Sequence, residues 1–364
     1  MKIAILLSFD CLPARLIGCY GNSSVCTPNF DRLAADSIVF DQHHCVADEL
    51  QQAVTPDPEN HDEFVCEQFS DLDLEFPQVP YQFASTPMVR MIRQWKEVVT
   101  CGMPSQDVVF HLRSRGITNP WRVCDELQLN AEEFEDAEED IAAELRAAVA
   151  KETTGEEDER WFGGWEVPPD DFSMQDCAQA RARAECFVEM LDAALGIVLD
   201  TIADTDHLHD ALLIVTAQRG MDFGESRARG RDLARYGPEW THTPLFMSCP
   251  GASPARRSVL STSADIAATV AGWLGQSAAT TTMKPADSWG CSLLPALDSN
   301  AVVRREIRLP AKGTRVIQAQ DFVLTTASGA NPELHVRPDD PWLVHNVATE
   351  YPHVIEELLN PAVE

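Results

Sequence analysis

The chain has 364 residues, 45% of them hydrophobic, and its 58 acidic residues against 28 basic ones give a formal net charge of −30. This length and apolar content are sufficient for a large buried core. The charge excludes nucleic acids and anionic membrane surfaces as general partners, because the whole molecule repels them. An anionic substrate would need a local cationic site to overcome the same repulsion.

The eleven cysteines include no C-x-x-C pair. An odd number without regular spacing is typical of reduced thiols, so we expect a cytoplasmic protein without a disulfide framework. The opening "MKIAILLSFD" has one lysine and a short apolar run that ends at an acid, which favours a buried strand over a signal peptide. No apolar run approaches the roughly 20 residues that a membrane-spanning helix needs.

The first half of the chain alternates predicted strands and helices. Residues 3–9 form a continuous apolar run that ends at Asp10, as expected of a strand covered on both faces. "TPNFDRLAAD" predicts a helix with Thr27 as N-cap and Pro28 at the first helical position. "SIVFDQ" predicts a strand that leads to Cys45, and residues 105–114 contain another strand. Residues 51–80 are polar and contain prolines, which indicates a loop.

The second half continues this pattern. Apolar residues from Phe187 to Ile202 recur at spacings of three and four, which predicts a long helix. "ALLIVTA" (211–217) predicts a buried strand ending at Gln218, and a strand and turn follow at 243–251. Residues 261–275 predict a helix with a glycine stop, and the last 60 residues predict short strands and a helix near 352–360. We therefore expect an α/β domain over residues 1–300, with a large, mostly parallel sheet flanked by helices, and a small C-terminal subdomain over 301–364.

Residues 125–170 form an acidic insertion in this scheme. Residues 125–159 alone contain 15 acids in 35 positions. The simpler interpretation is a solvated helix and loop, and the alternative is an interaction surface for a basic protein partner. Two histidine-containing stretches, "DHLHD" (206–210) and "HHC" (43–45), have the ligand types of a transition-metal site. For both, a role in packing or as a solvated loop is the simpler interpretation.

The order of several segments resembles the sulfatase family of the alkaline phosphatase superfamily. "FDCLPARLIGCYGNSSVCTPNFDRLAADSIVFDQHHC" is similar to the opening block of the family, and "LDAALGIVLDTIADTDHLHDALLIVTAQRGMDFGE" is similar to its second block. "HTPLFMSCPG", the helix after it and "ELHVRPDDPWLVHNVA" resemble later blocks. The resemblance implies the family's α/β fold. It also implies sulfate-ester hydrolysis by a formylglycine made from the cysteine of C-x-P/A-x-R, beside a divalent cation, usually calcium, held by oxygen ligands.

The metal positions implied by this resemblance are largely altered. The first acid is present as Asp10, but the second position is Cys11, a poor ligand for a hard cation. The later Asp position is Gln218, which retains a carbonyl oxygen, and the next is Arg219, which has no lone pair to offer. Asp222 and Glu225 follow these positions and are candidates to rescue a weak cation site.

The nucleophile position is Cys45, with Ala47 in the third slot of the motif and Glu49 where the motif has arginine. Because maturation needs that arginine, we expect an unmodified thiol. The expected H-x-P histidine falls at Thr118. A substrate-gripping lysine or histidine has no clear counterpart, although Arg229, Arg231 and Arg235 lie nearby in the sequence.

Arg219 changes the electrostatics of such a site. At ~4 Å and an effective dielectric constant near 20, a divalent ion and a guanidinium repel each other by several kcal/mol. We therefore expect no cofactor, with calcium bound only if the ancestral site survives, and we predict that Arg219 pairs with Asp10, Glu49 or both. The alternative is that Glu49 and Arg219 both point to solvent.

Three functions fit this pattern. The first is a sulfatase-like protein that has lost hydrolysis and acts as a binding or regulatory partner. The second is a sulfate- or phosphate-ester hydrolase with a rebuilt site that uses Asp10, Asp222, Cys45 and the arginines. The third is a structural subunit that pairs with an active paralogue.

Overall fold

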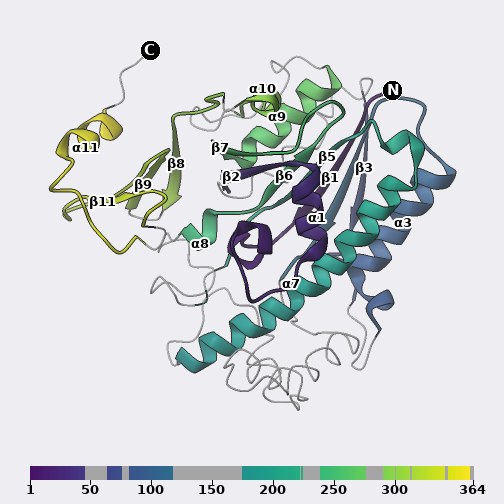
Figure 1. Cartoon of the computed structure of the whole chain (residues 1–364), viewed down its shortest axis with the longest axis horizontal. Helices are drawn as coiled ribbons and strands as arrows, with labels where there is room; N and C mark the ends of the chain where they lie inside the picture. The colour runs from purple at the N-terminus through teal and green to yellow at the C-terminus, as the bar shows by residue number, and fades with distance from the viewer. Residues whose placement is uncertain are drawn as a thin grey trace.

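The computed structural model describes residues 1–45, 64–75, 82–117, 174–221, 223, 238–275, 290–299, 301–311, 314–340 and 343–360. Their core is a seven-stranded sheet in the order β3-β4-β1-β5-β6-β2-β7, in which β6 is antiparallel to both of its neighbours (Figure 1). The strands are β1 (Ile3–Phe9), β2 (Ile38–His44), β3 (Val65–Ser70), β4 (Val108–Ser114), β5 (Leu212–Ala217), β6 (Leu245–Ser248) and β7 (Ala255–Thr262).

Helices cover both faces of this sheet because its central strands are apolar on both sides. On β1, Ile5 and Leu7 pack in a cluster with residues of three helices, α1 (Pro28–Asp36), α3 (Pro87–Cys101) and α7 (Met174–Ala203). Ala4 and Leu6, which alternate with these residues along β1, point to the other face and pack in a second cluster with α9 (Ser263–Leu274) and α10 (Leu294–Asp298). The predicted α/β class with a mostly parallel, helix-flanked sheet is confirmed.

A separate four-stranded antiparallel sheet lies toward the C-terminus, beside the helix α11 (Pro352–Leu359) (Figure 1). Its order is β11-β10-β9-β8, from β8 (Glu306–Ala311), β9 (Thr314–Ala319), β10 (Phe322–Ala327) and β11 (Glu333–Val336). Leu324 and Leu334 of this sheet pack with Leu358 of α11. Among the described helices, none combines the length and the apolar character that a bilayer span requires.

The prediction of a loop over residues 51–80 is wrong over Val65–Ser70, where β3 pairs in parallel with β4. This strand is at the edge of the sheet and most of its side chains are half-buried, so its sequence lacks the continuous apolar run that marks β1 and β5. The helix predicted from residue 261 begins at Ser263, because residues 261 and 262 still belong to β7.

The N-terminus of α1 is capped by a carboxylate that the sequence pattern did not indicate. Thr27 is the N-cap residue, but its hydroxyl accepts a hydrogen bond from the Gly18 backbone instead. The carboxylate of Asp192 on α7 accepts hydrogen bonds from the backbone N–H groups of Asn29 and Phe30. This contact fixes α1 against α7, and thereby the segment between β1 and β2, because an anion is favoured at a helix N-terminus.

Candidate functional site

The parallel register brings the predicted site residues to one edge of the large sheet. Phe9, the last residue of β1, lies opposite Ser114 on β4 and Ala217 on β5. Asp10 and Gln218 therefore follow neighbouring strands and lie side by side. Backbone hydrogen bonds hold both residues in place: Asp10 N donates to Ser114 O at 2.7 Å, and Gln218 N donates to Phe9 O at 2.8 Å. The carboxyl ends of strands are where open α/β sheets place their active sites.

Asp10 is paired with an arginine that the sequence analysis did not name. Its two carboxylate oxygens accept hydrogen bonds from Arg113 Nε at 3.0 Å and Arg113 Nη2 at 3.3 Å. The Asp10 side chain is 12% exposed and that of Arg113 is 22% exposed. Within the described residues no ion pair joins Asp10 to Arg219, so that part of the prediction is wrong. The reason is the register of β1 with β4, which places Arg113 on the neighbouring strand, where its guanidinium binds the Asp10 carboxylate in a bidentate geometry.

A second buried carboxylate lies beside this pair. Asp71, at the end of β3, is 2% exposed and accepts hydrogen bonds from Ser114 Oγ and Arg115 N, both at 2.7 Å. Burial raises the pKa of the Asp71 carboxyl, and its hydrogen bonds oppose that rise. Arg115 also donates to the backbone carbonyls of Asp71 and Leu72. Asp71 therefore organises the ends of β3 and β4, which carry the partner of Asp10.

The loop after β4 also closes on the second metal position. Gly116 has φ +61°, and a Cβ atom on it would lie 2.2 Å from the Cys11 carbonyl oxygen, so glycine is required there. The Cys11 side chain is fully buried, and its thiol donates to Gly220 O at 3.3 Å. A buried thiol used in this way supplies no hard oxygen ligand.

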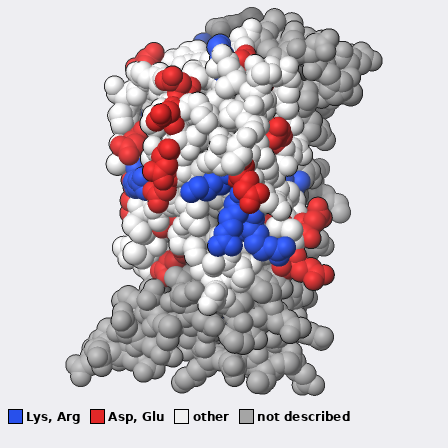
Figure 2. Space-filling view, turned by 90° about the vertical axis from the view of Figure 1, so that its right-hand side faces the viewer, with Lys and Arg blue, Asp and Glu red and all other residues white. Residues whose placement is uncertain are grey.

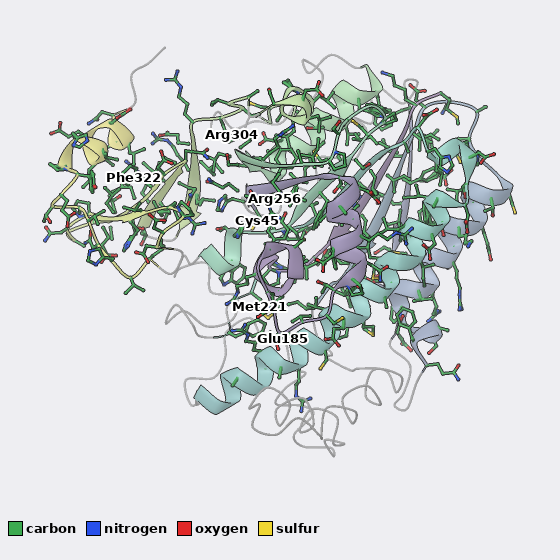
Figure 3. The ribbon with its side chains drawn as sticks, viewed as in Figure 1. Cys45, Glu185, Met221, Arg256, Arg304 and Phe322 are labelled. Atoms are coloured by element: carbon green, nitrogen blue, oxygen red, sulfur yellow. The ribbon has the colours of Figure 1, made fainter. Side chains whose placement is uncertain are left out.

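Cys45 follows β2 and is also a buried thiol. Its backbone N–H donates to Thr241 O at 2.7 Å, and its Sγ donates to Trp240 O at 3.3 Å, so α8 (Pro238–Thr241) covers it. Burial raises the pKa of the Cys45 thiol to about 12; Cys11 adds to this rise and Arg219 opposes it. The thiolate is therefore scarce at neutral pH, chiefly because the thiol is buried. In Figure 3, Cys45 lies toward the centre of the molecule, whereas Phe322 lies in the small sheet.

Gln218 and Arg219 present buried donors at the same edge. Gln218 Nε2 and Arg219 Nε are each buried without a hydrogen-bond partner in the part of the chain that is described. The backbone of Arg219 is held because its carbonyl accepts a hydrogen bond from Leu12 N at 2.9 Å. Two N–H groups of this kind can donate to an oxyanion, and neither nitrogen can coordinate a cation.

Several predicted residues cannot be placed in this site. Glu49, and with it the predicted Arg219–Glu49 pair, lies outside the described residues. The same holds for the acidic segment 125–159 and for Ala47, Thr118, Asp222, Glu225, Arg229, Arg231 and Arg235.

The "HHC" histidines have packing roles in the structure. His43 Nδ1 is 3.0 Å from Ser261 Oγ, and His44 Nδ1 is 3.3 Å from Thr241 Oγ1. Burial lowers the pKa of His43 to about 3, so its imidazole is neutral at pH 7. His44 stacks against His242, with ring centroids 5.6 Å apart. Over the described residues, no group of three histidine, cysteine, aspartate or glutamate side chains has the arrangement of a metal site.

The described residues at this sheet edge therefore do not fit a hard divalent cation. The one carboxylate at the ligand positions, Asp10, already has a cationic partner in Arg113, and Cys11 and Arg219 supply no oxygen. A divalent ion beside Asp10 would face the Arg113 guanidinium at close range, which costs several kcal/mol at an effective dielectric constant near 20.

Comparisons with known proteins agree on the family and the fold. The family model described as Sulfatase matches residues 90–276. A phosphonate monoester hydrolase of Agrobacterium radiobacter has a TM-score of 0.71 at 16% identity, and the alignment covers 98% of this chain and 94% of that one. A protein solved in complex with its substrate D-glucosamine-2-N,6-O-disulfate has a TM-score of 0.72 at 15% identity, covering 98% and 95%. A search among curated proteins finds no significant match.

Proposed function

The chain belongs to the sulfatase family, and from this premise we propose that it has lost the family's cation- and formylglycine-dependent ester hydrolysis and acts by binding. The observation that carries the proposal is the fork between Arg113 and Asp10, at 3.0 and 3.3 Å. It places a permanent cation on the one carboxylate that remains at the ligand positions. An arginine stays charged at every accessible pH, so this pair does not give way to a divalent ion at neutral pH.

The nucleophile position supports the same proposal. Glu49 stands where the maturation motif has arginine, and the Cys45 side chain is buried, with its thiol donating to the Trp240 carbonyl. As a thiol with a pKa of about 12, Cys45 is also a weak nucleophile at neutral pH. Neither the aldehyde chemistry nor a simple thiolate attack is therefore favoured at this position.

The buried donors of Gln218 and Arg219 support a second candidate, hydrolysis of a sulfate or phosphate ester at a rebuilt site. Their unpartnered N–H groups would donate to the oxygens of a bound oxyanion without the help of a metal. A nucleophile would still be required, and at the sheet edge the thiols of Cys11 and Cys45 and the Ser114 hydroxyl are all buried, the last of them donating to Asp71. For that reason we favour binding without turnover.

Turnover of nitrophenyl sulfate and nitrophenyl phosphate by the wild-type protein and by Asp10→Ala distinguishes the two candidates. The proposal predicts no hydrolysis above the buffer rate by either protein. Clear hydrolysis of either ester by the wild type that Asp10→Ala abolishes would show a working active site and overturn the proposal. Asp31→Ala, at an exposed position on α1 outside the site, is the matched control for loss of one carboxylate.

A further inference from the structure

The outer face of α3 is basic although the protein as a whole is strongly acidic. Arg90, Arg93 and Lys96 follow one another at spacings of three residues, and all three are exposed. Residues three apart on a helix are neighbours on its surface. The helix has one acid, Glu97. In Figure 2, lysine and arginine side chains gather in the middle of the face on which α3 lies. We call Arg90, Arg93 and Lys96 the α3 basic patch.

The α3 basic patch is not neutralised within the described structure. Two other exposed arginines have a carboxylate partner there: Arg32 pairs with Asp200 at 2.6 Å, and Arg256 pairs with Asp41. In the described part of the chain, neither an ion pair nor a hydrogen bond is formed by the charged side chain of any patch residue, and Glu97 on the same helix forms no ion pair with them. Among the described residues, therefore, no ion pair has to be broken before the patch binds a partner.

The α3 basic patch is also held rigidly and lies apart from the candidate site. The opposite face of α3 is anchored by Met91, Ile92 and Trp95, each fully buried. The helix begins with Thr86 as a capped N-terminus and packs against β3, β4 and α7. The candidate site is built from the ends of β1, β2, β3, β4 and β5, and among the described residues α3 contributes none to it. A preformed helix face loses little conformational entropy on binding.

From this arrangement we infer that the α3 basic patch is a docking surface for an acidic segment of another protein. Guanidinium groups bind carboxylates in a bidentate geometry, and two of the three cations are arginines. The net charge of −30 argues against long, densely charged polyanions, because they extend beyond the patch into the negative field of the whole molecule. A short acidic segment contacts the patch within about 8 Å, the screening length at physiological ionic strength, where the local cations dominate.

Binding of a short fluorescein-labelled oligo-glutamate peptide to the full-length protein, followed by fluorescence anisotropy at low salt, tests this inference. The variant is Arg90→Gln/Arg93→Gln/Lys96→Gln, which retains strong helix formers at exposed positions. We expect its dissociation constant to rise about tenfold, because the binding free energies of three exposed charge contacts are lost together. Binding by the wild type should also weaken steeply as salt is added.

The matched control is Arg32→Gln/Arg256→Gln/Arg315→Gln, which lowers the net charge by the same three units at exposed positions elsewhere. The inference predicts wild-type affinity for this control. An equal loss in both variants would show that only the overall charge matters and would overturn it, as would a wild type that does not bind the peptide. If heparin bound more tightly than oligo-glutamate and the α3 variant lost heparin binding, the partner would be a sulfated polymer and the inference of an acidic protein segment would be wrong.

Discussion

On the β1–β4–β3 half of the sheet edge, acids are retained and arginines pair with them, whereas on the β5–β6–β2 half an amide, Gln218, stands where an acid would be and a buried thiol, Cys45, stands at the nucleophile position. Asp10 and Asp71 have Arg113 and Arg115 as partners on the first half. On the second half Cys45 is a buried, neutral thiol. The two halves illustrate two ways in which a metal site can become unable to bind its cation. An arginine side chain can take the place of the cation, or neutral residues can replace its carboxylate ligands.

The largest expected effect concerns the thiol half. Because burial raises the pKa of Cys45 to about 12, its thiolate fraction at pH 8 should be roughly a thousandfold below that of an ordinary thiol. Alkylation by iodoacetamide, quantified peptide by peptide by mass spectrometry, should modify the exposed Cys101 first and Cys45 roughly a thousandfold more slowly. The rate at Cys45 should rise about tenfold per pH unit through pH 10. Equal rates at the two cysteines would contradict a buried neutral thiol.

The next effect concerns the arginine half. Arg113→Met removes the partner of a carboxylate that is 12% exposed, so the free energy of unfolding should fall by about 3 kcal/mol in urea titrations at pH 7. Adding Asp10→Asn should restore most of this loss, because no charge is then left unpaired. Arg32→Met is the control: it breaks the exposed pair with Asp200 and should cost less than about 1 kcal/mol. A loss at Arg113 no larger than at Arg32 would mean that the Asp10 pair does not neutralise a buried charge.

A smaller effect concerns His111, which precedes Arg113 by two residues on β4. Burial, and then the Arg113 charge, lower its pKa from 6.5 to about 4, and its Nε2 is 2.8 Å from Ser8 Oγ. A lowered pKa stabilises the fold above pH 6.5, and this stability is lost as the pH falls toward 4. His111→Gln should therefore reduce the loss of unfolding free energy between pH 7 and pH 5 by about 2 kcal/mol. Parallel pH profiles for the wild type and the variant would show that His111 carries no such linkage.

The sequence predicted the frame of the molecule better than its site. β1 and β5 were evident because a strand buried on both faces is a continuous apolar run, whereas β3 was missed because an edge strand is half-exposed. Asp10, Cys11, Cys45 and Gln218 were identified by resemblance, and the register does bring the strands that carry them to one edge.

The partner of Asp10 was beyond sequence reasoning because the two residues are 103 positions apart, and only the pairing of β1 with β4 brings them together. One signal was present: Arg113 is a charge near the end of an otherwise apolar run, "VVFHLRS". Arg219 was expected to fill that role because it stands at a ligand position. The fold gave the role to Arg113, whose guanidinium approaches both carboxylate oxygens.

Isothermal titration of the metal-free wild-type protein with calcium tests most directly whether internal cations have replaced the metal. We predict no saturable heat in the wild type, because Arg113 pairs with Asp10 and the neighbouring described positions, Cys11, Gln218 and Arg219, supply no further carboxylate. Binding of one calcium ion per chain that Asp10→Ala abolishes would contradict the account.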